Sequence, residues 1–533
     1  MTDLATLRLQ RIVDRLLAPW EGADGPGVTI GVVRDDALVL HRSAGLAHIE
    51  PGVAIGPGTT FRIASVSKQF TCAAILMLQA EGKLRTEDDV RDHIAGFPNL
   101  GHRITLAHLM HNTSGIRDML EIMRLGGVDL SQPCTPQDLL DGVCRQRDLN
   151  FAPGTRYLYS NSNFMLLGRI VEQISGEAFA DFLDRRIFAP LGMTMTRHTP
   201  TTTELVPGLA TAYLPAPSGW RRARHGFPLH GEGGLVSSVE DLALWHARFG
   251  VPARHGTALA EALTTMTPFA NGLPNTYARG LRIKTYRGVR TVGHDGLWPG
   301  FKTSFIRVPA HRAAVICISN DGASDPHDLA FQVVDALVDG ASGVHAVPPM
   351  PAWAGADLLG CYLDRGSGAT VELARDKQGR VTANTNGTTT WLVATAEGLL
   401  ATSRGSGDLT LRVEGNVMAL ERDAGVRATL HRAAAVAVLP PDLAGRYANA
   451  DTAATWAITA TDVGAELRIA GPLVQAGPWD IAPVEGDHIR IYTPITLYRG
   501  WLDTTVRRDA GGKITGLHVD GGRVKGLVFT RLP

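Results

Sequence analysis

The sequence has 533 residues, of which 44% are hydrophobic and 20% are charged, a composition typical of folded globular proteins. Its 52 lysines and arginines balance its 52 aspartates and glutamates, and this zero net charge argues against a nucleic-acid partner or an anionic membrane surface. The chain is about three times as long as an average domain and is therefore expected to contain several domains.

The N-terminal segment mixes charged and apolar residues. Its leucines and isoleucine follow helical spacing, which predicts an amphipathic helix and not the continuous apolar core of a secretory signal. The longest apolar runs of the chain are much shorter than the ~20 residues that a membrane-spanning helix needs. We therefore expect a soluble, cytoplasmic protein.

The first part of the chain is expected to combine strands and helices. Alternating apolar residues over 28–33 and 37–40 predict a hairpin, and an apolar stripe predicts a helix over 68–82. Further helices are expected over 163–174 and 178–187, and strands over 280–285, 290–294, 304–308 and 313–319. Strands at both ends with helices between them predict an α+β domain, with helices on an antiparallel sheet.

Two segments rich in alanine, glycine and proline, Gly340–Pro351 and Ala433–Pro441, suggest domain boundaries. We expect a domain over 1–340 and two smaller ones over 352–433 and 442–533. The hexapeptide DLLGCY at 357–362 recurs as DLAGRY at 442–447, and a second echo links 375–382 with 508–515. Short alternating strands with glycine-bearing turns predict two related antiparallel β-barrels.

The five cysteines are odd in number and scattered, and they form no C-x-x-C pair. Neither a disulfide framework nor a metal site is expected from them, and no cofactor is expected. The sequence also contains no G-x-S-x-G, H-E-x-x-H, P-loop or dinucleotide fingerprint. These absences argue against the nucleophile elbow of α/β-hydrolases and against zinc-protease chemistry.

Ser65 and Lys68 lie three residues apart at the expected start of the helix over 68–82. Residues at this spacing share one helix face, so the amine can reach the hydroxyl. An unperturbed lysine is a poor base near neutral pH, because its pKa is ~10.4, and burial beside positive charge would be needed to make it one. Alone, the pair is also compatible with a surface lysine.

Two further motifs carry polar groups suited to the same chemistry. Tyr159 and Asn161 follow a Pro-Gly turn; a phenol can pass a proton and an amide can orient a lysine or a substrate. Taken singly, Tyr159 could be a core aromatic residue and Asn161 a helix cap. The third motif, Gly293–Leu297, is expected to end a strand, where glycine allows close approach of a substrate.

In combination, S-x-x-K, Y-S-N and H-x-G resemble the motifs of the penicillin-recognising serine hydrolases, which include class C β-lactamases, D,D-peptidases and related esterases and aminopeptidases. The resemblance covers residues of about 10 to 335. A β-lactamase-like domain followed by two barrels, with histidine at the strand motif, is most similar to the bacterial D-aminopeptidases. The family also implies a homodimer.

The resemblance assigns a role to each motif residue. It implies that Ser65 is the nucleophile, Lys68 its base and Tyr159 the proton relay. It implies that Asn161, His294 and Gly296 contact substrate, and that the backbone N–H groups of Ser65 and Leu297 form the oxyanion hole. The sequence is therefore expected to encode a serine hydrolase that releases N-terminal D-amino acids from small peptides, amides or esters.

His294 occupies the place usually held by a lysine in this family. An imidazole with the reference pKa of ~6.5 is mostly neutral at pH 7, so the need for an anionic substrate carboxylate weakens. This argument disfavours a carboxypeptidase or an efficient β-lactamase. An esterase, a weak β-lactamase or D,D-peptidase, and a non-catalytic peptide-binding protein remain the alternatives.

In the D-aminopeptidases, a loop of the last barrel meets the free amine of the substrate with an acidic residue. The corresponding stretch here is Gly471–Trp501, which offers Asp480 and Asp487 as candidates, whereas Pro494–Gly500 contains no carboxylate. Both aspartates could equally be turn residues. An aminopeptidase is therefore not separated from an amidase or an esterase by sequence.

Overall fold

The computed structural model describes residues 4–250, 256–338 and 350–533, apart from 352–353, 387, 396, 403–408, 423–424, 435–436 and 495–499. Most of the boundary expected at Gly340–Pro351 lies outside these residues. The chain forms two compact units: the first comprises 1–97, 103–114 and 161–345, and the second 98–102, 115–160 and 346–533.

The first unit is built on a six-stranded antiparallel sheet with the order β10-β11-β12-β13-β1-β2. Strands from both ends of this part of the chain therefore pair in its centre. Their bounds are β1 (Val28–Arg34), β2 (Ala37–Ala44), β10 (Arg282–Tyr286), β11 (Val289–Trp298), β12 (Phe301–Val308) and β13 (Ala313–Ser319).

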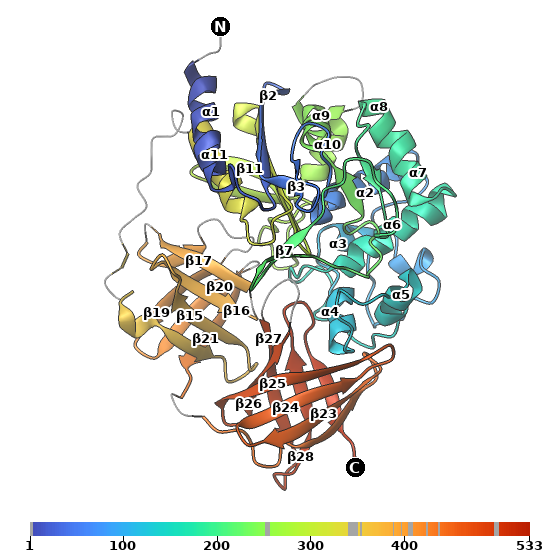
Figure 1. The fold of residues 1–533 in the computed structure, drawn as a ribbon. Coiled ribbons are helices and arrows are strands. Elements are labelled where there is room, and N and C mark those ends of the chain that lie inside the picture. The colour runs from blue at the N-terminus through green and yellow to red at the C-terminus, as the bar shows by residue number, and fades with distance from the viewer. Residues whose placement is uncertain are drawn as a thin grey trace. The chain divides into compact units, whose positions relative to one another are not determined.

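Helices cover both faces of this sheet, as the blue, yellow and green ribbons of Figure 1 show. On one face, α1 (Leu4–Leu17) and α11 (Pro326–Val338) share a core with Val28, Ile30 and Val32 of β1. On the other face lies α9 (Val239–Gly250): a Cβ at Gly31 would come within 2.3 Å of the Val239 side chain. Alternate residues of β1 thus pack against the helices on opposite faces of the sheet.

The remaining elements of the first unit form a helical layer and small sheets. The helices are α2 (Lys68–Ala80), α3 (Leu106–Met110), α6 (Asn161–Ser175), α7 (Phe179–Leu183), α8 (Ala189–Leu191) and α10 (Gly256–Thr264). The small sheets contain β3 (Leu46–His48), β4 (Val53–Ala54), β5 (Phe61–Arg62), β6 (Arg197–His198), β7 (Tyr213–Ala216), β8 (Gly219–Arg222) and β9 (Leu235–Ser237). The expected arrangement of helices on an antiparallel sheet is confirmed.

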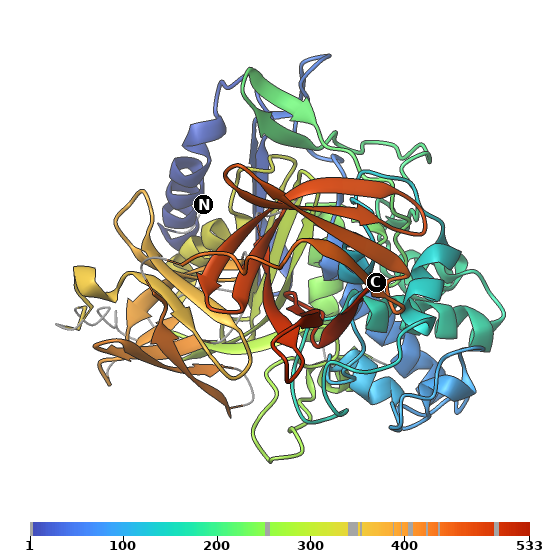
Figure 2. The ribbon, with the colours of Figure 1, turned by 90° about the horizontal axis from the view of Figure 1, so that it is seen from below.

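The second unit contains two closed antiparallel barrels of consecutive strands, drawn in orange and red in Figures 1 and 2. The first has β14 (Gly360–Leu363), β15 (Thr370–Arg375), β16 (Val381–Thr385), β17 (Thr388–Ala394), β18 (Leu400–Thr402), β19 (Leu409–Glu414), β20 (Val417–Arg422) and β21 (Val426–Arg432). The second has β22 (Gly445–Asn449), β23 (Ala454–Thr461), β24 (Gly464–Ala470), β25 (Gln475–Glu485), β26 (His488–Thr493), β27 (Gly500–Arg508), β28 (Ile514–Asp520) and β29 (Leu527–Arg531). The two expected barrels are confirmed.

The repeated hexapeptide plays the same part in both barrels. Tyr362 and Tyr447 lie on the first strand of each, and each hydroxyl donates to the carbonyl four residues upstream, at 2.8 and 2.6 Å. Arg432 and Arg531, from the last strands, lie over these two rings at 5.1 and 5.6 Å. The hexapeptide therefore marks the closure of first strand on last strand in each barrel.

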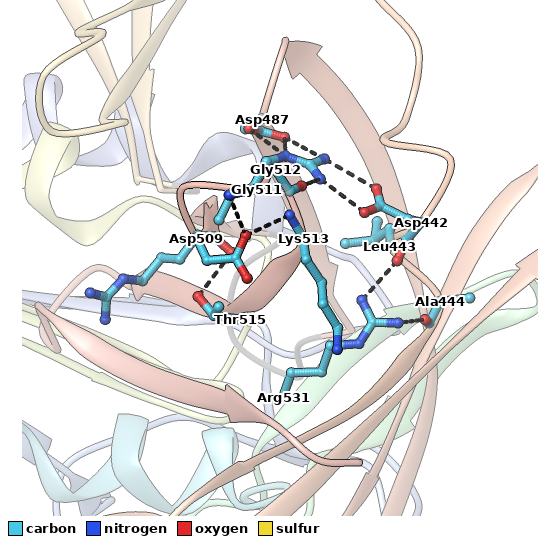
Figure 3. Close-up of polar contacts among 12 residues, drawn as sticks. Asp442, Leu443, Ala444, Asp487, Asp509, Gly511, Gly512, Lys513, Thr515 and Arg531 are labelled. Atoms are coloured by element: carbon cyan, nitrogen blue, oxygen red, sulfur yellow. Dashed lines mark hydrogen bonds and ion pairs between the residues drawn. The ribbon is translucent and has the colours of Figure 1, made fainter.

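The second echo forms the same turn at different places. Asp376 and Asp509 each accept backbone N–H bonds from the residues two and four positions later, and Figure 3 shows this turn for Asp509. The first turn joins β15 to β16, whereas the second joins β27 to β28. The turns are alike because aspartate at the start of such a loop satisfies its N–H groups.

Residues 115–160 pack on the second barrel within the second unit. They include α4 (Met119–Leu125) and α5 (Pro136–Cys144). Ile122 and Leu125 belong to the core of this barrel, and the indole of Trp456 donates to the Leu125 carbonyl at 3.0 Å. Residues 115–160 are therefore held by residues of the second barrel.

No helix in the described part of the chain is long and apolar enough to cross a membrane.

Candidate active site

Ser65 lies in a tight turn between a short strand and a helix. The 3-10 turn Ala64–Ser67 follows β5 and leads directly into α2. Ala64 has φ of +47°, a left-handed conformation that is uncommon for a residue with a side chain. The continuous helical path from Ser65 to Lys68 places both side chains on one face, as their spacing predicts.

Lys68 is fully buried and its amine contacts oxygen atoms of several residues. Nζ lies 3.1 Å from Oγ of Ser65, 2.9 Å from Oδ1 of Asn161 and 2.6 Å from the carbonyl oxygen of Glu232. An ammonium group can donate to all three acceptors. A neutral amine can donate to Asn161 and Glu232 and turn its lone pair to Ser65, which is the arrangement a base needs.

Asn161 is the first residue of α6 and is buried, so its amide faces the interior and not solvent. Its oxygen is used by Lys68. Of the two roles considered for this amide, the orientation of Lys68 is the one seen in its contacts.

The third motif lies in the last part of β11, which continues to Trp298 and thus extends beyond the strand expected over 290–294. The extension arises because Gly296 and Leu297 keep pairing with Thr303 and Lys302 of β12. A Cβ at Gly296 would lie 2.2 Å from the carbonyl oxygen of Ile63. Glycine therefore lets β11 pass against the turn that carries Ser65.

His294 is buried and neutral. Its Nδ1 lies 2.6 Å from the carbonyl oxygen of Asp295 and must carry the proton of that hydrogen bond. Nε2 is then the acceptor for the Tyr277 hydroxyl, at 3.0 Å. Burial, with the positive charges of Lys68 and Arg282, lowers the pKa of His294 to about 3. The motif therefore presents no cation at neutral pH.

Two neighbours of the motif residues were not predicted from sequence. Tyr277 donates its hydroxyl hydrogen to Nε2 of His294, but it belongs to no recognisable motif. Glu232 follows Gly231 in the segment GEGG, and its buried carboxyl has an oxygen, Oε2, with no hydrogen-bond partner among the described residues. Burial raises the pKa of this carboxyl. The sequence signal that could have pointed to Glu232 was a charged residue between glycines.

Tyr159 belongs to the second unit, whereas Ser65, Lys68, Asn161 and His294 belong to the first. The ring of Tyr159 is half-buried, and the guanidinium carbon of Arg523 lies over it, 4.7 Å from the centroid. The cationic neighbour of Tyr159 in this unit thus comes from the loop between β28 and β29.

The two candidate amine-binding acids differ in their surroundings. Asp487 accepts hydrogen bonds of 3.0 and 3.1 Å from Arg508, which also binds Asp442, as Figure 3 shows. This arginine, between two carboxylates, ties Asp487 to the barrel. Asp480 is exposed on β25, opposite Glu466 of β24. Residues 495–499 of the expected loop lie outside the described residues.

No group of three or more histidine, cysteine, aspartate or glutamate residues in the described ranges could hold a metal ion.

Comparison with known proteins agrees with this geometry. A sequence model of the Beta-lactamase family matches residues 9–338. A D-aminopeptidase of Cereibacter sphaeroides is 29% identical over 93% of this chain and 94% of its own. A D-aminopeptidase of Brucella ovis is 29% identical over 95% and 96% of the two chains. The solved octameric penicillin-binding protein homologue from Pyrococcus abyssi covers 98% of this chain and 99% of its own, with a TM-score of 0.54 at 18% identity. The resemblance drawn from the motifs is confirmed.

Proposed function

We propose that this chain, which belongs to the Beta-lactamase family, is a serine hydrolase that releases N-terminal D-amino acids from small peptides, amides or esters. The observation that carries the proposal is the 3.1 Å contact between Nζ of buried Lys68 and Oγ of Ser65. The D-aminopeptidase names of relatives that match nearly the whole chain supply the substrate class.

In the proposed reaction, Oγ of Ser65 attacks the carbonyl carbon of the N-terminal residue while Lys68 takes the hydroxyl proton. The carbonyl oxygen becomes an oxyanion, held by the backbone N–H groups of Ser65 and Leu297, and preorganised donors of this kind lower the barrier most. The proton reaches the leaving amine through Lys68 and Tyr159, which leaves an acyl group on Ser65. Water then attacks the ester and restores the serine.

Neutral His294 supports substrates without an anionic carboxylate at this strand. A fixed lysine cation would favour a peptide C-terminus or a β-lactam carboxylate, whereas an uncharged imidazole provides no such attraction. Amino-acid amides and peptides bound by their N-terminal end are the matching class. Asp480 and Asp487 remain our candidates for the residue that meets their amine.

An esterase is the second candidate function, and one observation favours it. Asp487 is engaged by Arg508, which leaves Asp480 as the exposed candidate of the two for binding a substrate amine. Because Arg508 already binds Asp487, fewer acids are open to a substrate amine, and simple esters that lack an amine become suitable substrates.

The domain bounds 1–340, 352–433 and 442–533, the cytoplasmic location and the homodimer are part of the same proposal. Size-exclusion chromatography with light scattering would test the dimer, which predicts twice the 57.0 kDa chain mass.

The test of the function uses four chromogenic substrates with the full chain: the p-nitroanilides of D-alanine and L-alanine, p-nitrophenyl acetate and a chromogenic β-lactam. We expect turnover of the D-anilide to exceed that of the L-anilide, and a mass increase of one acyl group on Ser65. Ser65→Ala should abolish both turnover and adduct without unfolding the protein. Full turnover in Ser65→Ala would refute the proposal, and acetate turnover without D-anilide turnover would favour the esterase.

A further inference from the structure

We infer that Arg523, in the loop between β28 and β29, is a positioning residue for the hydrolytic reaction, because it supplies the positive charge beside Tyr159. The inference rests on the proposed function, in which Tyr159 passes a proton. It assigns the C-terminal barrel a part in the chemical step that is separate from recognition of the substrate amine.

The contact between the two side chains is direct. The guanidinium carbon of Arg523 lies 4.7 Å from the centre of the Tyr159 ring, within the range of a cation–π interaction. The side chain of Arg523 is 34% exposed, and a carboxylate oxygen of Asp118 lies 3.7 Å from its guanidinium. That carboxylate also accepts the N–H groups of Leu120 and Glu121 at the start of α4, so its charge is shared.

The backbone on both sides of Arg523 is fixed by residues 115–160. The carboxylate of Glu121 accepts the N–H groups of Gly522 (2.9 Å) and Arg523. Asn150 donates to the carbonyl of Arg523 at 3.0 Å and accepts the N–H of Lys525 at 2.7 Å. A loop held at four points cannot move its arginine far from Tyr159.

The glycines at the two ends of the loop also fit these hydrogen bonds to residues 115–160, which we call the clamp. A Cβ at Gly521 would lie 2.2 Å from Oε1 of Glu121, so a side chain there would displace the carboxylate that holds the loop. Gly526, at the other end, has φ of +69° and donates to Asp520 at 2.7 Å. The clamp therefore depends on backbone geometry at both ends of the loop, and the arginine side chain is not needed to form it.

The charge of Arg523 matters because Tyr159 passes a proton in the proposed reaction. A tyrosine that passes a proton spends part of the reaction as a phenolate, and a nearby cation favours that form. Arg523 supplies a permanent cation over the ring of Tyr159. Its guanidinium takes no proton itself because it stays charged at all working pH values.

Several charged groups pack around the loop in the second unit. They include Asp118, which caps α4, Glu121 and Arg124 within α4, Arg117 just before the cap, and Asp520 and Lys525 beside the loop. Arg124 pairs with Glu121, and Arg117 pairs with Asp451. The guanidinium of Arg523 is in contact with the ring of Tyr159.

The test is the pH dependence of kcat/KM for D-alanine p-nitroanilide in Arg523→Met, Arg523→Lys and the unchanged enzyme. Ionisation of the substrate amine is common to all three, so differences between the profiles report the enzyme. Loss of the cation disfavours the phenolate, so the rise of kcat/KM with pH should move upward by about one pH unit in Arg523→Met. At pH 7 the rate should fall about tenfold, and Arg523→Lys should recover most of the loss.

Arg507→Met is the matched control, because Arg507 is exposed on β27 of the same barrel. Its pH profile should overlie that of the unchanged enzyme. If Arg523→Met fails to fold, Arg523→Gln replaces it in the comparison with the unchanged enzyme. A pH profile that does not move in the folded Met or Gln variant would overturn the inference, even if the rate falls. Failure of the proposed function would look different, since Ser65 of the unchanged enzyme would then form no acyl adduct.

Discussion

The amide oxygen of Asn161, the first residue of α6, accepts a hydrogen bond of 2.9 Å from Nζ of Lys68 on α2. These two residues are 93 positions apart in the chain. Together with the carbonyl of Glu232, 2.6 Å from the same nitrogen, the amide directs the amine toward Ser65. The orientation of the Lys68 amine toward Ser65 therefore depends on three segments that meet in the first unit.

Removing this amide should slow catalysis more than it destabilises the fold. In Asn161→Ala, the amine of Lys68 loses one of two fixed acceptors and no longer points steadily at Ser65. A hydrogen bond to a charged group is worth about 1.5–3 kcal/mol, so kcat/KM should fall about 10- to 100-fold. Steady-state kinetics with D-alanine p-nitroanilide would measure this. Asn99→Ala, at an exposed turn, should leave kcat/KM unchanged; equal losses in both variants would contradict the assignment.

The fold class and the Ser65–Lys68 contact could be predicted because both depend on short-range patterns. Strand and helix periods are local, and a spacing of three residues on a helix fixes a side-chain contact. The continuation of β11 past His294 could not be predicted, because pairing with β12 decides where the strand ends. The contacts of Tyr277 and Arg523 could not be predicted either, because each residue meets its partner only through tertiary folding and neither belongs to a motif.

The grouping of residues 115–160 with the second barrel was also invisible in the sequence. The composition of the chain changes near 340, which favours a boundary there and nowhere earlier. In the structure, Ile122 and Leu125 bury their side chains among barrel residues. Contacts between segments more than 300 residues apart, such as Leu125 with Trp456, leave no periodic signal.

Replacing Gly296 by alanine should damage the site and lower stability. The added methyl would lie 2.2 Å from the carbonyl of Ile63, next to the turn that carries Ser65. Overpacking of this kind costs about 1–3 kcal/mol, and urea unfolding should show that loss together with slower acylation of Ser65. Gly56→Ala is the control, because a Cβ there meets nothing within 4 Å. Wild-type stability and acylation in Gly296→Ala would show that β11 does not press on the turn.

The buried ion pair of Arg117 and Asp451 should contribute strongly to holding residues 115–160 on the second barrel. Their nearest atoms are 2.8 Å apart, with side-chain exposures of 2% and 11%. Loss of one member of such a pair strands a buried charge and costs about 3–5 kcal/mol, so Asp451→Asn should greatly reduce the urea midpoint. Glu421→Gln, which removes an exposed pair with Arg427, should change stability by less than about 1 kcal/mol. The prediction is wrong if the two substitutions have similar effects.

Stability should fall as pH falls below about 6.5, because three histidines of the first unit are buried in the neutral form. Burial lowers the pKa of His111 to about 4, and that of His246 and His294 to about 3. The unfolded chain, with pKa values of ~6.5, binds more protons than the folded chain between these limits, so acid favours unfolding. These three groups alone contribute a slope of about 4 kcal/mol per pH unit between pH 6 and 4. His198 and His225, whose pKa burial also lowers to about 3, add to it.

Urea midpoints measured from pH 8 to pH 5 would show this slope. His246→Gln should reduce it by about a fifth, whereas His102→Gln, at an exposed position, should not change it. A slope that is the same in His246→Gln as in the unchanged protein would show that His246 is already charged in the fold.

Substituting lysine for His294 should change which substrates acylate the enzyme. The imidazole is neutral because Nδ1 donates to the Asp295 carbonyl and Nε2 accepts from Tyr277. A lysine would bring a cation to this strand and attract a substrate carboxylate, so acylation by benzylpenicillin should rise about tenfold relative to D-alanine p-nitroanilide turnover. Mass spectrometry of the adduct on Ser65 would follow both reactions. Tyr277→Phe is the control, because it removes the hydrogen bond to Nε2 without adding a charge and should give no gain with penicillin. A gain of equal size in Tyr277→Phe would mean that loosening of the site, and not charge, sets the preference.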